Sequence, residues 1–214
     1  MKLSAYLGML IKEFTTGPYQ GQVQKAREEF FEQSGTVHED SPVYKERMDL
    51  FLDWYVFDRK LEEDDLTPVE LFIERNTDKF SNEEKQVFDG MIDSISSLYL
   101  VKEVSSSRLR VKDMFTGKSY KVEEPELVDL LNKGDIFQGR IVPFMGGFVF
   151  SEGFCFHDQE ARSYMESEIR KIKSMPKHYH HSFMMKLALM KLKTMEYNHV
   201  PIKYIYSDAP KVSF

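Results

Sequence analysis

The sequence predicts an α+β protein with three regions. Apolar residues recur every three or four positions before residue 96 and again after residue 158, which indicates amphipathic helices, whereas they alternate with polar residues in between. We therefore expect a helical region over residues 1–96 and a small antiparallel β-barrel or strongly bent sheet over residues 97–157. A basic helical region over residues 158–214 is expected to pack back on one of them. A chain of 214 residues suffices for one large or two small domains.

The N-terminal part predicts two amphipathic helices. The first ends at Gly17-Pro18 and carries one apolar stripe: Leu3, Tyr6, Leu7, Leu10, Ile11 and Phe14. That stripe is either part of the core or a surface for a partner or a second copy of the chain. The second helix runs from Gln20 to Gln33, with these inward residues: Val23, Ala26, Phe30 and Phe31.

Three further helix starts are marked by capping residues. Ser41 followed by Pro42 predicts a helix that reaches Arg59 with Met48, Phe51, Leu52 and Tyr55 on one face. Thr67-Pro68 predicts a short helix by the same logic. Ser81 and Glu84 form a capping-box pattern before a helix whose inward residues are Val87, Met91, Ile92 and Ile95.

The middle of the chain predicts five or six short strands. β-branched and aromatic residues begin at Ser97, and turns recur at short intervals. A polar insert with one helical turn is expected over residues 123–133, and Gly139 suits a bulge or sharp bend within its strand. The expected strands cover residues 98–101, 109–111, 119–122, 136–142 and 148–150, with a further one near Cys155.

Two helices and a strand are expected at the end of the chain. Asp158 is a candidate N-cap, and Pro176 ends the helix that buries Ala161, Met165, Ile169 and Ile172. The second helix spans Phe183 to Met195 and is apolar around much of its circumference. The alternating residues Ile202, Tyr204 and Tyr206 predict an edge strand.

The charge is unevenly distributed. Residues 160–214 contain ten Lys and Arg against five Asp and Glu, whereas residues 1–159 contain 19 against 30. Such an asymmetry either marks an end that binds polyanions or reflects two regions that attract each other. The run Glu62 to Asp65 lacks the alternating ligands and the glycine of a calcium loop, so we interpret it as a solvated loop.

Residues 48–150 resemble an uncharacterised group of bacterial cytoplasmic proteins, some of which carry a SEC-C zinc motif. The resemblance lies in these segments: residues 51–58 (FLDWYVFD), 97–104 (SLYLVKEV), 111–117 (VKDMFTG), 134–135 (GD) and 140–143 (RIVP). It implies the helix-then-barrel architecture and a bacterial cytoplasmic setting, and it implies no reaction. The zinc tail is missing because Cys155 is the single cysteine, so no metal role carries over.

Residues with chemical potential form no familiar catalytic pattern. His178, His180 and His181 are weak metal candidates without a recognised ligand spacing, so we expect no metal and no cofactor. Cys155 and His157 would lie about 7 Å apart on one strand face, too far for a nucleophile and its base. Asp53 and Asp58 are five residues apart on one helix, which predicts different faces rather than a facing acid–base pair.

The sequence favours two classes of binding function over an enzymatic function. The first is a non-catalytic binding or scaffolding protein that acts through protein–protein contacts, with twelve methionines that adapt to partner surfaces and self-association through the first helix as one form. The alternative is a nucleic-acid-binding protein that uses the small barrel and the basic C-terminal region, although the pI near 5.6 is unlike that of a dedicated binder. A hydrolase or metal-dependent enzyme comes third. The candidate binding residues are Lys186, Lys191, Lys193, Arg108, Arg110 and Tyr120.

The sequence also predicts a cytoplasmic location. No apolar run approaches the roughly 18 residues of a membrane span, and the segment from Met1 to Ser4 does not have the pattern of a signal peptide.

Overall fold

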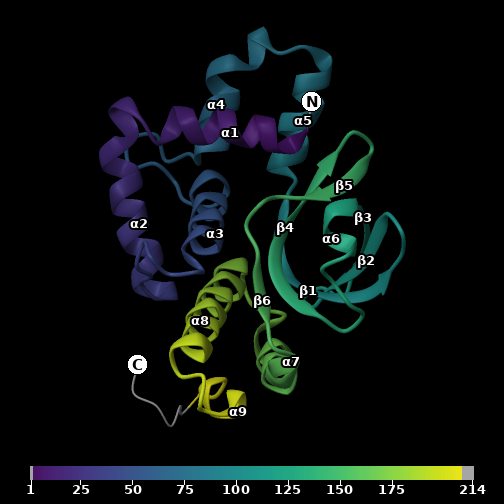
Figure 1. Cartoon of the computed structure of the whole chain (residues 1–214). Coiled ribbons are helices and arrows are strands. Elements are labelled where there is room, and N and C mark those ends of the chain that lie inside the picture. The colour runs from purple at the N-terminus through teal and green to yellow at the C-terminus, as the bar shows by residue number, and fades with distance from the viewer. Residues whose placement is uncertain (1, 209–214) are drawn as a thin grey trace. The chain divides into compact units, whose positions relative to one another are not determined.

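The computed structural model describes residues 2–208 and confirms the α+β class, with helices at both ends and a curled antiparallel sheet between them (Figure 1). Met1 and residues 209–214, which belong to the first and last predicted regions, lie outside the described residues. The helices before the sheet are α1 (Leu3–Phe14), η1 (Gly17–Tyr19), α2 (Gln20–Ser34), α3 (Tyr44–Phe57), α4 (Pro68–Asn76), η2 (Thr77–Lys79) and α5 (Asn82–Ile92). The strands and the short helix among them are β1 (Ile95–Val104), β2 (Arg108–Asp113), β3 (Ser119–Glu123), α6 (Pro125–Val128), β4 (Ile136–Phe144), β5 (Gly147–Phe150) and β6 (Cys155–His157). The last helices are η3 (Gln159–Ala161), α7 (Arg162–Ile172), α8 (Lys177–Glu196) and α9 (Ile202–Ile205).

The chain folds into two compact units, each assembled from separate stretches of sequence. Unit 1 comprises Met1–Phe31, Val37–Ser96 and Gly139–Phe154. Unit 2 comprises Glu32–Thr36, Ser97–Gln138 and Cys155–Phe214. Strands β1 and β4 therefore pass from one unit to the other.

Local capping determines two of the three expected helix starts. At α4 the Thr67 hydroxyl accepts from the Glu70 backbone N–H at 3.4 Å, while the Glu70 carboxylate accepts from the Thr67 N–H at 2.8 Å. Ser81 and Glu84 form the same reciprocal pair at α5. The start at Ser41 was wrong, because its carbonyl accepts from the Tyr44 N–H in a turn and α3 begins only at Tyr44. Ile92, expected to face inward, is 48% exposed because α5 ends there.

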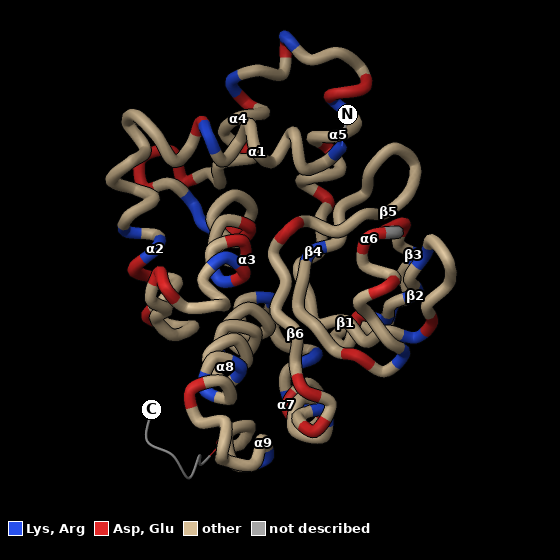
Figure 2. The backbone as a smooth tube through the Cα atoms, in the orientation of Figure 1, with Lys and Arg blue, Asp and Glu red and all other residues tan. Residues whose placement is uncertain are grey.

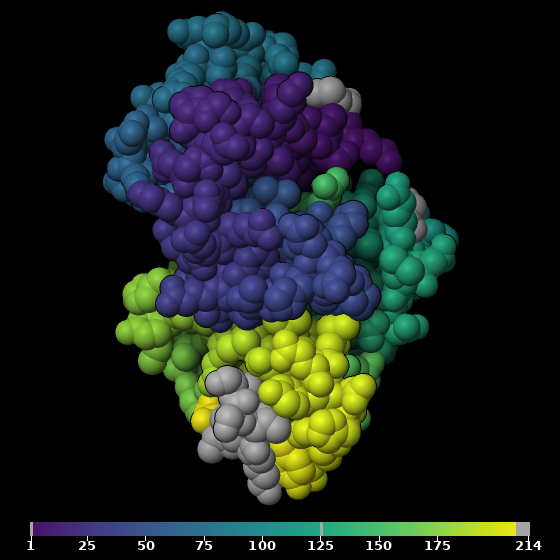
Figure 3. All heavy atoms as spheres, turned by 60° about the vertical axis from the view of Figure 1, so that its left-hand side comes forward, coloured from purple at the N-terminus to yellow at the C-terminus, as the bar shows by residue number. Residues whose placement is uncertain are grey.

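The core of unit 1 is built on α1, α2 and α3. The α1 stripe is buried, with Leu10 and Phe14 fully covered, so it belongs to the core rather than to an exposed surface. The buried Tyr55 hydroxyl of α3 donates to the Phe14 carbonyl at 2.8 Å. Phe30 of α2 contacts the ring of Phe51 on α3. In the space-filling view, α1 and α2 form one continuous purple face of this unit (Figure 3).

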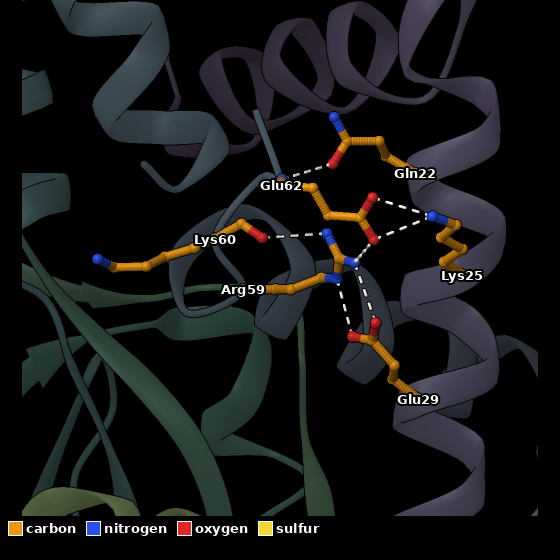
Figure 4. Close-up of polar contacts among 6 residues, drawn as sticks. All are labelled: Gln22, Lys25, Glu29, Arg59, Lys60 and Glu62. Atoms are coloured by element: carbon orange, nitrogen blue, oxygen red, sulfur yellow. Dashed lines mark hydrogen bonds and ion pairs between the residues drawn. The ribbon is translucent and has the colours of Figure 1, made fainter. Parts of the chain in front are cut away.

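The acidic run after α3 forms a loop, as interpreted from the sequence, and it is attached to α2 by ion pairs. Arg59, which is 7% exposed, donates through two nitrogens to the Glu29 carboxylate at 2.9 and 3.0 Å (Figure 4). Glu62 accepts from Lys25 at 2.9 Å, and its backbone N–H donates to Gln22. Asp64 pairs with Arg75, so the negative charges of the run are balanced by nearby cations.

The sheet has the strand order β3-β2-β1-β4-β5, with β6 pairing to β4, and it curls into a half-barrel. The first part of β4, Ile136 to Gln138, pairs with β6, whereas Ile141 to Phe144 pair with β5. Gly139 lies between these two paired stretches, where β4 changes its partner. Gly90 of α5 lies so close to β4 that an added Cβ would come within 2.1 Å of the Pro143 carbonyl oxygen.

A buried ion cluster joins α3 to β4 in unit 1. Arg140 of β4 is 3% exposed and donates to Asp53 at 2.9 Å, to Asp58 and to the Ser94 hydroxyl. Its guanidinium also lies over the Phe57 ring at 4.4 Å. Burial alone lowers the pKa of Arg140, but the two carboxylates outweigh it and hold the pKa above its usual range. The expectation that Asp53 and Asp58 lie apart was wrong: α3 ends at Phe57, and the non-helical Asp58 turns toward the same guanidinium.

A second buried carboxylate organises the turn between β2 and β3 in unit 2. Asp113 is 1% exposed and accepts from the Ser97 hydroxyl at 2.6 Å, the Phe115 N–H at 2.9 Å and the Thr116 hydroxyl at 2.6 Å. Gly117 follows with φ of 78°, a conformation that glycine adopts without strain. The segment Asp113 to Gly117 therefore has a structural role.

The C-terminal helices of unit 2 cover one face of the strands. Their apolar residues form a single cluster with strand residues Leu98, Leu100 and Ile136. Asp158 does not cap α7, which begins at Arg162 after the short turn η3. Helix α8 begins at Lys177, earlier than expected. The tail forms helix α9 rather than an edge strand, and Pro201 precedes its first turn. Ile205 and Tyr206, three and four residues after Ile202, are both buried, and this spacing is that of a helix.

We predict that Arg140→Met destabilises unit 1 by about 3–5 kcal/mol, because it leaves Asp53 buried without its counter-ion. Chemical denaturation followed by tryptophan fluorescence measures the effect, since Trp54, the single tryptophan, lies in unit 1. The matched control is Lys25→Met, which removes an exposed cation of the same unit and should leave the midpoint nearly unchanged. Equal midpoints for the two variants would contradict a stabilising role for the cluster.

Candidate functional site: a basic groove in unit 2

The three lysines that the sequence nominated on α8 are each paired with a carboxylate of unit 2. Lys186 donates to Asp208 at 3.0 Å, Lys191 to Asp158 at 2.9 Å and Lys193 to Glu196 at 2.7 Å. Asp208 also accepts from the Tyr164 hydroxyl at 3.1 Å, and Lys186 holds the pKa of this carboxyl below its usual range. Lys186 and Lys191 therefore connect α8 to other segments of unit 2, whereas Lys193 pairs within α8.

The nominated residues of the sheet are also engaged in intramolecular contacts. Arg108 pairs with Glu123 at 2.9 Å across β2 and β3, and Arg110 pairs with Glu103 of β1. Tyr120 is 4% exposed and makes an edge-on contact with Tyr99. Its ring is therefore placed in the core and offers little surface to a ligand.

The structure instead brings other basic residues together in a groove of about 300 Å³. One wall is α7 with its C-cap residue Lys173, and the lining positions 162, 166, 169, 170 and 173 form a single stripe at helical spacing. The other wall is formed by β1 and β2. Figure 2 shows the basic and acidic positions that follow one another along α7.

The groove combines an apolar floor with a basic rim. Leu100 and Ile169 are buried and Met114 is half-buried, and these three residues form the floor. Exposed Lys102 and Lys112 line the strand side, and exposed Arg170 and Lys173 line the helix side. None of these four cations forms an ion pair with another residue of the described range 2–208.

One end of the groove is electrically neutral. Arg162 donates to Glu166, four residues later on α7, at 2.8 Å. Glu166 is the only carboxylate among the described residues that line the groove. Given a rise of about 1.5 Å per residue, Arg170 lies about 6 Å along the helix axis from Glu166 and about 12 Å from Arg162.

The register of the sheet explains why these residues meet. Lys112 of β2 is opposite Leu100 of β1, and the pairing then slips between Val101 and Glu103. Lys102 is the extra residue of this bulge, and a bulge redirects its side chain. The sequence nominated the lysines of α8 and missed both the basic stripe of α7 and the strand positions that face it.

Two of the candidate histidines near the start of α8 are placed beside aromatic rings. His180 stacks on Phe115 with centroids 4.3 Å apart, and its Nε2 donates to the Ile172 carbonyl at 3.0 Å. His178 is exposed beside the Tyr179 ring. Within residues 2–208 no three metal-ligating side chains come together.

Cys155 and His157 both belong to β6, as the sequence indicated, and the imidazole is held by other groups. His157 Nδ1 accepts from the Tyr206 hydroxyl at 3.0 Å, and Nε2 donates to the Gln138 side-chain oxygen at 3.3 Å. The neutral ring with its proton on Nε2 satisfies both partners. Burial and the nearby Lys191 lower the pKa of His157 to about 3.

Comparison with known proteins assigns the chain to a family. The sequence matches a family of unknown function, DUF7986, over residues 25–194, so the chain belongs to this family. This agrees with the uncharacterised group that the sequence resembles. Searches of curated proteins and of solved structures gave no match. None of the helices within residues 2–208 is both long and apolar enough to cross a membrane.

We predict that unit 2 loses stability in mild acid through His157. The pKa is about 3 in the folded state and about 6.5 when unfolded, so the unfolded chain binds the extra proton between these values. Stability is therefore complete above pH 6.5 and falls by about 1.4 kcal/mol for each pH unit below it. Urea denaturation at pH 7.5 and pH 5.0, followed by circular dichroism, should show a loss of about 2 kcal/mol.

The variant His157→Gln isolates this contribution, because glutamine retains hydrogen-bonding groups and does not titrate. Its stability should change less between the two pH values than that of the parent protein. The same pH dependence in both proteins would show that His157 is not the responsible group.

Proposed function

We propose that this chain is a non-catalytic binding protein that acts through protein–protein contacts, and that the basic groove holds its partner. The observation that supports the proposal is a set of four exposed cations around an apolar floor, none of which forms an ion pair within residues 2–208: Lys102, Lys112, Arg170 and Lys173. As the resemblance implies, we place the protein in the bacterial cytoplasm, in a group of which some members carry a SEC-C motif.

The physical argument rests on electrostatic complementarity. Like charges that converge on one groove repel each other and create a positive potential there. An anionic partner relieves this repulsion and is attracted from a distance, which raises the association rate more than the final affinity. The paired lysines of α8 contribute less, because nearby carboxylates offset their charge.

The lining of the groove favours a protein partner over a nucleic acid. Proteins that bind single strands stack the bases on aromatic side chains. The described lining residues include no aromatic ring, and Tyr120 is buried. Leucine, methionine and isoleucine on the floor instead suit apolar side chains of a protein. Nucleic-acid binding remains the alternative and is tested in the same experiment.

We predict that a labelled polyglutamate peptide binds the full chain with salt-sensitive affinity. Replacement of the four rim cations by Gln should weaken binding by about tenfold or more, since each exposed ion pair contributes about 0.2–1 kcal/mol. Fluorescence anisotropy at about 50 and 200 mM salt measures this, because added salt screens exposed charges.

The matched control changes four basic residues that do not line the groove, Lys85, Lys121, Lys133 and Lys177, to Gln. It alters the net charge equally and should bind almost as the parent does. Equal weakening in both variants would show a general charge effect and contradict the groove. Tighter, salt-sensitive binding of single-stranded RNA or DNA through the same cations would favour the nucleic-acid alternative.

A further inference from the structure

The apolar floor limits what the groove can recognise. Leu100, Met114 and Ile169 form its base, and a ligand that carries only negative charges would leave this base in contact with water. Covering apolar surface stabilises a complex by about 25 cal/mol for each Å² removed from water. The groove therefore suits a ligand that presents an apolar group between its charges.

The dimensions of the groove limit the ligand to a short segment. About 300 Å³ accommodates the side chains of a few residues. An α-helix with its side chains is about 10–12 Å wide, which is more than such a volume admits. A linear segment of a partner chain, without a fold of its own at this point, fits better.

The spacing of the rim cations matches that of neighbouring acidic side chains. Arg170 and Lys173 are three residues apart on α7, a separation of about 5–6 Å between Cβ atoms. Residues two apart on an extended chain repeat at about 6.6 Å. Two carboxylates at that spacing therefore reach two cations on one wall.

The neutral end of the groove gives the ligand a direction. The Arg162–Glu166 pair offers no net charge, and the Glu166 carboxylate repels an acidic residue placed there. Arg170 follows Glu166 by about one helical turn, and Lys173, at the C-terminal end of α7, follows it by about two turns. The acidic residues of the ligand are therefore favoured at the Arg170 end.

We infer that the groove binds a short linear protein segment. Apolar residues of this segment contact the floor, and its acidic residues contact Lys102, Lys112, Arg170 and Lys173. The Glu166 carboxylate repels further acidic residues of the segment and so weakens binding. This inference rests on the proposed function and adds to it the chemistry of the partner. It also assigns a role to Glu166, whose removal increases binding.

The experiment uses the full chain and four labelled probes of twelve units. The first peptide mixes Leu and Glu, the second has Ser in place of Leu, the third has Gln in place of Glu, and the fourth probe is single-stranded oligouridine. We expect the Leu–Glu peptide to bind at least about tenfold more tightly than each of the other three, as measured by anisotropy at about 50 mM salt.

The variant Glu166→Gln makes the prediction specific, because a misfolded protein does not gain affinity. It leaves Arg162 unpaired within the groove and should tighten binding of the Leu–Glu peptide by about threefold to tenfold. The matched control is Glu160→Gln, which removes the same charge from an exposed residue outside the groove and should leave binding unchanged.

The outcomes separate this inference from the proposed function. If the Ser-containing acidic peptide binds as tightly as the Leu–Glu peptide, the groove binds acidic chains but the role of its floor is overturned. If Glu166→Gln has no more effect than Glu160→Gln, the role of Glu166 is overturned. Tighter binding of oligouridine, or no binding of any probe, overturns both the inference and the proposed function.

Discussion

The buried guanidinium of Arg140 is the constraint on which unit 1 depends. Removing such a group from water costs several kcal/mol unless carboxylates accompany it. Asp53 supplies one from within α3, and Asp58 supplies the other just after that helix ends. The Arg140 side chain thus holds α3 against β4 and contacts the residue that follows the end of α3 at Phe57. Helices α1 and α2 in turn pack on α3. The need to neutralise a buried guanidinium accounts for the position of the two aspartates.

The basic residues of unit 2 fall into two groups, one paired with carboxylates and one around the groove. On α8, Lys186 and Lys191 pair with Asp208 and Asp158, two carboxylates of the same unit that lie just after α9 and β6. Around the groove, Lys102, Lys112, Arg170 and Lys173 surround apolar residues and form no ion pair within the described residues. Matched charges contribute to architecture, whereas unmatched charges in one place are available to another molecule. This distinction, more than the total charge of the C-terminal region, locates the candidate site.

Local signals in the sequence predicted much of the fold, and long-range contacts account for the rest. Thr67 and Ser81 mark helix starts because their capping partners lie three residues away. Ser41 has the same residue type but lies in a turn. Tyr204 and Tyr206 alternated like a strand, although the burial of Ile205 and Tyr206 follows a helix. The groove could not be predicted, because Lys102 and Lys112 meet α7 only through the sheet register and the bulge.

The interleaved composition of the two units has a consequence for how the chain folds as it is synthesised. Unit 1 needs residues 139–154, which emerge well after its first helices, and unit 2 includes the short segment from Glu32 to Thr36. Arg140 is translated more than 80 residues after Asp53 and Asp58. Contacts so distant in sequence form slowly because a long loop must close first. The early helices therefore leave the ribosome with their carboxylates still solvated, and unit 1 is completed only after most of the sheet has been made.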